Sequence, residues 1–143
     1  MTFPDSDGGL VVLDASVAAK WFVDETSSEE ARSILRQLGD EPRSFAVPEL
    51  FFIEMLSVLS RMAASEEQLK DLLRILEELG LARLALGNDT LQRAAELTHT
   101  WGLSAYDAVY AATADLIGGR WLTADSRAHS KIESLGISSL LAG

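Results

Sequence analysis

Four acidic residues occupy positions from which carboxylates could bind a metal ion: Asp14, Glu54, Asp107 and Asp125. Asp14 directly follows the apolar run Leu10–Leu13, and Asp125 comes two residues after the segment Arg120–Thr123. Carboxylate oxygens suit Mg²⁺ or Mn²⁺, which keep several waters and bind substrate phosphates. Without a cation, four acids in one small volume would repel one another and raise their pKa values. The set therefore predicts metal-assisted chemistry on a phosphate-containing substrate.

The three aspartates also have a simpler interpretation as helix caps. Asp14 could cap a helix that begins near Val17, and Asp125 stands before a helix that it could cap itself, because Asp is a preferred N-cap residue. Asp107 lies three residues after Ser104, which is the spacing of a capping box. Each aspartate alone is therefore compatible with either role.

Glu54 is the most informative of the four acids. Its predicted helix, Pro48 to about Ala64, is apolar nearly all round, which is typical of a buried helix. A carboxylate in the middle of such a helix is costly unless it is paired or bound to a metal. The alternative is a thin solvent-exposed stripe, because Glu54, Ser57 and Arg61 stand at i, i+3 and i+7.

The elements that must position these acids form an alternating pattern. The predicted strands are Leu10–Leu13, Ser44–Val47, Ala82–Leu86, Arg120–Thr123 and, at an edge, Ile137–Leu141. They are separated by helices and never by a hairpin turn, which predicts a parallel, three-layer α/β fold. In such sheets ligands bind outside the carboxyl ends of the strands, where Asp14 and Asp125 are expected.

Composition narrows the functional classes. The chain has 143 residues, no cysteine and a net charge of 12 − 22 = −10. It predicts a polar tail over residues 1–9 and one domain over residues 10–143, with no signal or membrane-spanning segment, so we expect a soluble cytoplasmic protein. The absence of cysteine excludes a thiol nucleophile and a thiolate zinc site. An acidic chain repels nucleic acid, so a role on RNA needs bound cations or a local basic rim.

Three segments carry a resemblance to a known family: VVLDASVAAKWFVDE (11–25), VPELFFIEMLSVLSRM (47–62) and GLSAYDAVYAATADLIGGRWLTADSR (102–127). In order and spacing they resemble the PIN domain, and within it the VapC-type toxin ribonucleases of bacterial toxin–antitoxin pairs. The resemblance covers residues 10–141. It implies a parallel α/β fold, Mg²⁺ or Mn²⁺ as cofactor, endonucleolytic cleavage of single-stranded RNA that leaves a 5′-phosphate, a cognate antitoxin partner and a homodimer.

The resemblance also assigns residues. The family's acidic positions, which are catalytic and bind metal, match Asp14, Glu54, Asp107 and Asp125, and its small hydroxyl positions match Ser16 and Thr123. Ser57 is a departure, because the family commonly has Asn three residues after the helix Glu. For RNA contacts we expect Arg127 and Lys131, which are i and i+4 on the last predicted helix, and Lys20.

Three alternatives stay open at this point. Arg127 and Lys131 could simply form a solvated helix face. The chain could be a PIN-fold protein-binding module that no longer catalyses a reaction, although all four acids are present. The aromatic residues Trp21, Phe22 and Phe51 could form a partner surface if they are exposed.

Overall fold

The computed structural model describes residues 9–141, which form one five-stranded, all-parallel sheet with the strand order β3-β2-β1-β4-β5. The strands are β1 (Val11–Leu13), β2 (Phe45–Pro48), β3 (Ala82–Leu84), β4 (Arg120–Thr123) and β5 (Ser138–Leu140). The predicted parallel α/β fold is confirmed, and the predicted edge strand near the C-terminus lies at an edge of the sheet.

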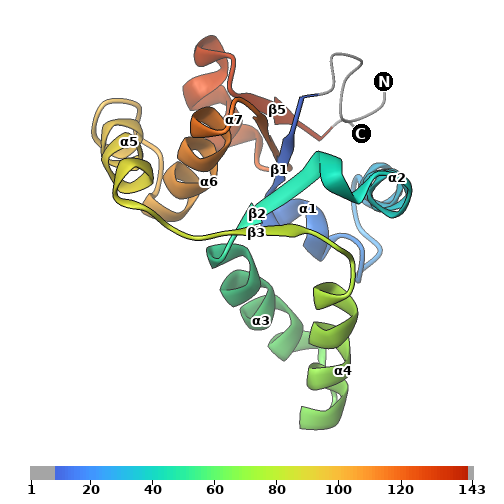
Figure 1. The fold of residues 1–143 in the computed structure, drawn as a ribbon. Helices are drawn as coiled ribbons and strands as arrows, with labels where there is room; N and C mark the ends of the chain where they lie inside the picture. Colours follow the sequence, from blue (N-terminus) through green and yellow to red (C-terminus); the bar gives the residue numbers. More distant parts are fainter. Residues whose placement is uncertain (1–8, 142–143) are drawn as a thin grey trace.

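Helices cover both faces of this sheet. They are α1 (Ala15–Ala19), α2 (Ser28–Asp40), α3 (Leu50–Met62), α4 (Glu66–Glu77), α5 (Asn88–His99), α6 (Ala105–Leu116) and α7 (Ser126–Ile132). Two short 3₁₀ helices span Pro42–Ser44 and Glu133–Leu135. In Figure 1, α1 to α4 lie on one side of the sheet and α5 to α7 on the other. Right-handed crossovers produce this arrangement, because the chain moves outward from β1 to β3 and then returns to the other side of β1.

The central strands β1 and β4 approach each other closely at their start. A Cβ built on Gly119 would lie only 2.5 Å from the carbonyl oxygen of Leu10, a distance that real Cβ atoms do not reach. The same carbonyl accepts a hydrogen bond from the Arg120 amide at 2.9 Å. Glycine at this position therefore lets β4 begin beside β1, and the pairing then runs on to Leu13 and Leu122.

Helix α3 differs from the sequence prediction in two ways. Pro48 does not begin the helix but ends β2, and the helix begins at Leu50. The prediction of a buried helix is also wrong, because Ile53 is 67% exposed and Leu56 is 43% exposed. The buried residues of α3 form a single stripe that faces the core: Phe51, Met55 and Leu59. An apolar composition alone does not show which apolar side chains the core covers.

Two other sequence predictions concern the ends of the chain and membranes. The predicted tail, residues 1–9, lies outside the described residues except for Gly9. Within residues 9–141, no helix combines the length and the apolar character that crossing a bilayer requires.

Candidate functional site

Between the neighbouring strands β1 and β4, the helices that follow the two strands lie on opposite faces of the sheet. The chain leaves β1 into α1 on one face, and it leaves β4 into α7 on the other. Such a switch point opens a crevice at the carboxyl ends of the two strands, where ligands of parallel α/β proteins commonly bind. Asp14 is the first residue after β1, and Asp125 is the second residue after β4. The structure therefore places both aspartates at the carboxyl ends of these neighbouring strands, where the crevice is expected.

Asp14 is the most buried of the four acids, with 5% of its surface exposed. Its Oδ2 accepts hydrogen bonds from the Ser16 hydroxyl at 2.6 Å and from the Thr123 hydroxyl at 2.7 Å. The two hydroxyl oxygens in turn accept backbone N–H groups, Ser16 from Ala124 at 3.0 Å and Thr123 from Asp125 at 3.0 Å. Because an ionised carboxylate only accepts hydrogen bonds, both hydroxyls donate to Asp14.

This hydrogen bonding settles the cap alternative for Asp14. Asp14 stands at the N-cap position of α1, but its side chain accepts no hydrogen bond from the helix backbone. Both of these hydrogen bonds end on Oδ2, and no described residue donates to Oδ1 of Asp14, which leaves Oδ1 available to a ligand. The carboxylate is thus held by one oxygen and free at the other.

The environment of Asp14 raises its pKa from 3.8 to about 6. Burial is the largest cause, because desolvation disfavours the charged form. The hydroxyls of Ser16 and Thr123 lower the pKa, while the charges of Asp107 and Glu54 raise it. The last two effects place Asp107 and Glu54 near enough to Asp14 to repel it.

Glu54 is half-buried on the side of α3 that faces the crevice. Its Oε1 is fully buried and has no hydrogen-bond partner, and the hydroxyl of Tyr110 is in the same condition. The pKa of Glu54 is raised, first by burial and then by Asp107, although the nearby Tyr110 hydroxyl lowers it. The buried Tyr110 hydroxyl is the nearby donor for this carboxylate, and a cation would be a second way to offset its burial.

Asp107 is half-buried on the first turn of α6. Its backbone N–H donates to the Ser104 hydroxyl at 3.1 Å, so the cap in this motif is Ser104. Burial raises the pKa of Asp107, as does Asp125, whereas Ser104 and Lys131 lower it.

Asp125 does act as a cap. Its Oδ1 accepts the backbone N–H groups of Arg127 at 3.0 Å and Ala128 at 3.1 Å at the start of α7. The cap interpretation is therefore correct for Asp125. Its charge still reaches the crevice, because it raises the pKa of Asp107.

The three basic residues predicted to contact RNA differ in whether their positive charge already has a partner. Lys20 pairs with Glu25 at 3.1 Å and donates to the carbonyl oxygen of Thr26 at 2.8 Å, so its ammonium is already engaged. Lys131 donates to the carbonyl oxygen of Gly102 at 3.0 Å, which holds it beside Asp107. Arg127 is exposed and forms no ion pair with any described residue.

Sequence reasoning did not single out Tyr110 or the contact between Lys131 and Gly102. Tyr110 lies one helical turn after Asp107, so the helical spacing could have indicated that both face the same neighbour. Gly102 adopts a positive φ of 79°, which glycine favours, and its carbonyl meets Lys131. A glycine before a capped helix gives no sequence signal for a lysine 29 residues away.

We tested whether these residues fit a divalent cation. The available donors are carboxylate oxygens, which are the ligands that Mg²⁺ and Mn²⁺ prefer. Burial raises the pKa values of Asp14 and Glu54, and the charges of Glu54 and Asp107 raise the pKa of Asp14 further, so a positive charge among these acids is favoured. Among residues 9–141, no three acidic or histidine side chains are grouped closely enough to form a ready metal site. The donors therefore fit a divalent cation by type, while the described side chains are not gathered into a formed metal site.

The comparisons with known proteins agree with this geometry. A profile of the PIN domain family matches residues 11–134, which is most of the chain and includes all four acids. The chain belongs to the PIN domain family. Members of this family are generally nucleases that use divalent metals, which supports a hydrolase acting on nucleic acids. Curated protein sequences give no significant match to this PIN domain.

Solved structures share the fold of this PIN domain at low sequence identity. One chain of a toxin–antitoxin complex from Klebsiella pneumoniae has a TM-score of 0.71 at 15% identity, covering 92% of this chain and 98% of that one. FitAcB from Neisseria gonorrhoeae gives 0.66 at 18% identity, with 87% and 94% covered. PAE2754 from Pyrobaculum aerophilum gives 0.60 at 19% identity, with 93% and 90% covered. At these identities the likeness concerns the fold alone.

Proposed function

We propose that this PIN domain is a cytoplasmic, Mg²⁺- or Mn²⁺-dependent endoribonuclease that cleaves single-stranded RNA and is the toxin of a toxin–antitoxin pair. The observation that carries the proposal is the buried Asp14 at the carboxyl end of β1, which the hydroxyls of Ser16 and Thr123 hold in place. The charges of Glu54 and Asp107 reach it and raise its pKa. Acids are costly to gather in this way unless a cation and a phosphate use them.

Each side chain then has a distinct role. Asp14 and Asp107 would hold the divalent cation, which would neutralise the charge that develops on the phosphodiester during hydrolysis, and Glu54 would act on the attacking water. Ser16 and Thr123 direct both hydroxyl protons to Asp14, so they are positioning residues rather than substrate contacts. Asp125 fixes the start of α7 through its cap and adds negative charge beside Asp107.

Glu54 is the best-placed group to accept a proton from the attacking water. Glu54 lines an open groove between α1 and α3, and burial raises its pKa, which makes it a better base than an exposed glutamate. Asp14 is less suited to this task, because two hydroxyls already donate to its Oδ2. We therefore assign proton acceptance to Glu54.

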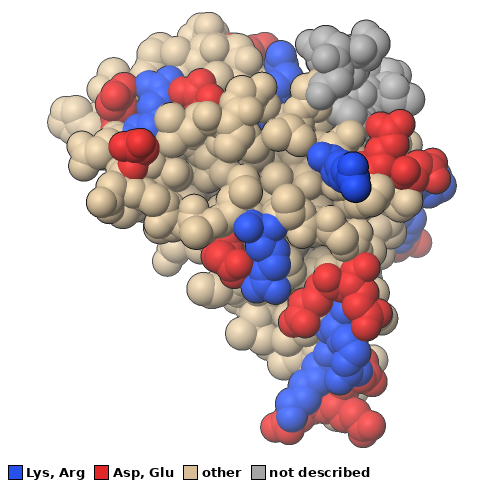
Figure 2. Space-filling view, viewed as in Figure 1, with Lys and Arg blue, Asp and Glu red and all other residues tan. Residues whose placement is uncertain are grey.

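The negative charge of the chain limits how RNA can approach. Figure 2 shows Lys and Arg side chains standing beside Asp and Glu, with no continuous basic surface on that face. Arg127 and Lys131, near the carboxyl end of β4, supply local positive charge for substrate phosphates, and Lys131 also offsets Asp107.

The proposal is tested by RNA cleavage with near-isosteric variants. We expect Asp14→Asn, Glu54→Gln and Asp107→Asn to lose most cleavage of single-stranded RNA in Mn²⁺ or Mg²⁺, with losses that do not add in the double variants. Asp125→Asn keeps the α7 cap, because Asn is an equally good N-cap, so any loss there reports on charge. Asp40→Asn, at the exposed end of α2, is the matched control. Full activity in two of the site variants would refute the assignment, and no metal-dependent cleavage by the wild type would favour a catalytically silent binding module.

We further propose an antitoxin as protein partner and a homodimer as the assembly. One structure with the same fold is a toxin–antitoxin complex, and the acidic crevice would accept an Arg or Lys side chain from an inhibitor, which could bridge its carboxylates. The apolar part of the contact cannot use Phe51, which is fully buried. Trp21 is only partly exposed, and its indole N–H donates to the Ala31 carbonyl, so exposed Ile53 and Leu56 fit this role better.

The homodimer proposal rests on exposed apolar side chains of the other layer. Leu91 on α5 is 47% exposed and Leu116 on α6 is 50% exposed. Light scattering of the wild type and of Leu116→Glu tests it, and a wild type that is monomeric at all concentrations would contradict it.

A further inference from the structure

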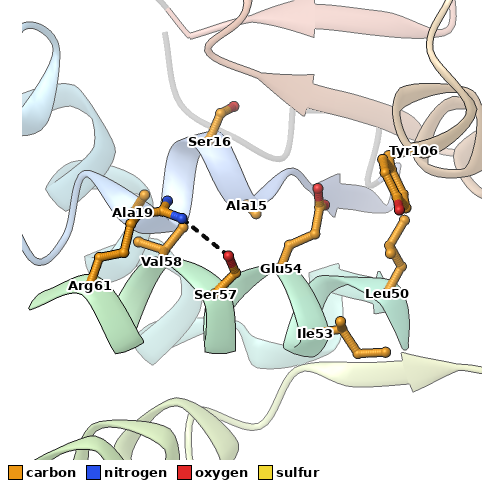
Figure 3. Close-up of a pocket in the computed structure, with 10 residues that line it drawn as sticks. All are labelled: Ala15, Ser16, Ala19, Leu50, Ile53, Glu54, Ser57, Val58, Arg61 and Tyr106. Atoms are coloured by element: carbon orange, nitrogen blue, oxygen red, sulfur yellow. Dashed lines mark hydrogen bonds between the residues drawn. The ribbon is translucent and has the colours of Figure 1, made fainter. Parts of the chain in front are cut away.

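A groove runs beside the acidic crevice between α1 and α3. Its cavity volume is about 430 Å³, and residues of α1, α3 and α6 line it. Figure 3 shows Glu54 projecting from the middle of α3, Tyr106 of α6 near one end of that helix beside Leu50, and Arg61 at the other end. From Leu50 to Arg61 a helix advances about 16 Å. The groove therefore extends to both sides of a carboxylate of the proposed catalytic set.

Tyr106 offers an aromatic ring at one end of this groove. Its side chain belongs to the first turn of α6, directly before Asp107, and the residue is 62% exposed. A large exposed aromatic at a site rim is a stacking surface, because every nucleobase has a π-face that can lie on it. The next residue on α6, Asp107, is one of the four acids.

Arg61 offers an uncompensated positive charge at the other end. One of its terminal nitrogens donates to the Ser57 hydroxyl at 3.1 Å, and this bond holds the guanidinium along α3. No acidic side chain among residues 9–141 forms an ion pair with it, unlike the arginines at 32, 36, 74, 83 and 93. A guanidinium has five N–H donors, so most of them remain free for an anion.

We propose that this groove holds a short stretch of single-stranded RNA across Glu54, with one base stacked on Tyr106 and a backbone phosphate bound by Arg61. The inference rests on the proposed nuclease function and adds to it the path of the strand. The two contacts lie on opposite sides of the catalytic carboxylate, so they place the scissile phosphate between them. A duplex cannot use this path, because its bases are stacked on one another and are not free to lie on Tyr106. The proposal therefore also gives a reason for single-strand selectivity.

The test measures RNA binding separately from cleavage. A fluorescein-labelled single-stranded RNA oligonucleotide is titrated with the full chain in Ca²⁺ by anisotropy, and a gel run afterwards confirms that the RNA is intact. A set of oligonucleotides with one abasic nucleotide at successive positions locates the base that stacks. We expect one position to weaken wild-type binding roughly five- to a hundredfold, and Tyr106→Leu to lose that dependence. Tyr106→Phe keeps the ring and should keep the dependence.

The phosphate contact has its own readout. Arg61→Ala should weaken binding to all sequences alike and flatten the slope of log K against log salt by about 0.7, the value for one phosphate of a single strand. Arg61→Lys should retain the slope, and Arg36→Ala, an exposed arginine on α2, should leave it unchanged. Ile75→Ala, an exposed apolar residue of α4, is the control for Tyr106→Leu.

The outcomes separate this inference from the proposed function. An abasic profile that is identical in the wild type and Tyr106→Leu, or equal salt slopes for Arg61→Ala and Arg36→Ala, would overturn the strand path even if RNA is cleaved. Variants at Tyr106 and Arg61 that change the binding of a protein partner but not of RNA would overturn it too. If the binding pattern appears without any metal-dependent cleavage, the groove stands and the nuclease proposal fails.

Discussion

The hydroxyl of Thr123 donates to Oδ2 of Asp14 at 2.7 Å, although the two residues are 109 positions apart in the chain. This bond joins the carboxyl ends of β1 and β4, the two strands between which the switch point opens. The Thr123 oxygen also accepts the Asp125 amide at 3.0 Å, so one buried hydroxyl links two of the four acids. The geometry of the acidic site thus depends on the pairing of the central strands.

We expect Thr123→Val to destabilise the fold by about 1–3 kcal/mol, because it leaves the buried Asp14 with one donor fewer and the Asp125 amide without an acceptor. Thr113→Val is the matched control, since the Thr113 hydroxyl is equally buried but donates only to the Val109 carbonyl of its own helix. Urea denaturation at pH 7 measures both. Equal losses in the two variants would mean that the bond to Asp14 contributes nothing specific.

Asp14 should make the metal-free protein less stable as pH rises. Its pKa is about 6 in the folded chain and 3.8 ordinarily, so the folded state binds the proton more tightly. The contribution to stability is fully present below about pH 4 and is lost as pH rises through 6, by up to about 3 kcal/mol. In EDTA, Asp14→Asn should gain stability relative to the wild type across this window, whereas Asp40→Asn should run parallel to the wild type. Parallel wild-type and Asp14→Asn profiles would contradict the raised pKa.

Divalent cations should stabilise the folded chain. A cation that binds only the folded state at a hundredfold excess over its dissociation constant stabilises by about 2.7 kcal/mol. Thermal melts in EDTA and in a Mg²⁺ or Mn²⁺ titration measure this effect. We expect Asp14→Asn to lose the response and Asp40→Asn to retain it. Midpoints of Asp14→Asn that follow those of the wild type throughout the titration would exclude Asp14 as a ligand.

Association with an antitoxin should be fast and should slow as salt is added, because a basic inhibitor segment is steered towards an acidic crevice. Asp14→Asn and Asp125→Asn each remove one negative charge from that crevice and should lower the association rate at low salt. Stopped-flow binding at two salt concentrations measures it. A rate that responds neither to salt nor to the substitutions would leave the electrostatic account without support.

Sequence patterns predicted the strands and the two aspartates that follow β1 and β4, because short apolar runs between helical segments leave few topologies. The placement of Asp14 follows from its position directly after a strand. The environment of Glu54 was harder to predict, since its helix carries more apolar residues than the core covers. The prediction of a fully buried α3 failed for Ile53 and Leu56 for this reason.

The contacts around the acids depend on packing that local patterns do not contain. The Tyr110 hydroxyl of α6 lies near Glu54 of α3, and each group shifts the pKa of the other. Lys131 reaches the Gly102 carbonyl through the return of α7 past the loop before α6. Neither contact corresponds to a characteristic spacing in the sequence. The sequence therefore predicted the acids better than the residues that shift their pKa values.

The close approach of Gly119 to Leu10 has a consequence at the far end of the same strands. A side chain at Gly119 would force the start of β4 away from β1, and paired strands as short as these would transmit that shift along their length to Thr123. A substitution with no atom near the carboxylates would then change their positions relative to one another. A loss of activity in a Gly119 variant would therefore arise from a changed spacing between β1 and β4, and not from the loss of a catalytic group.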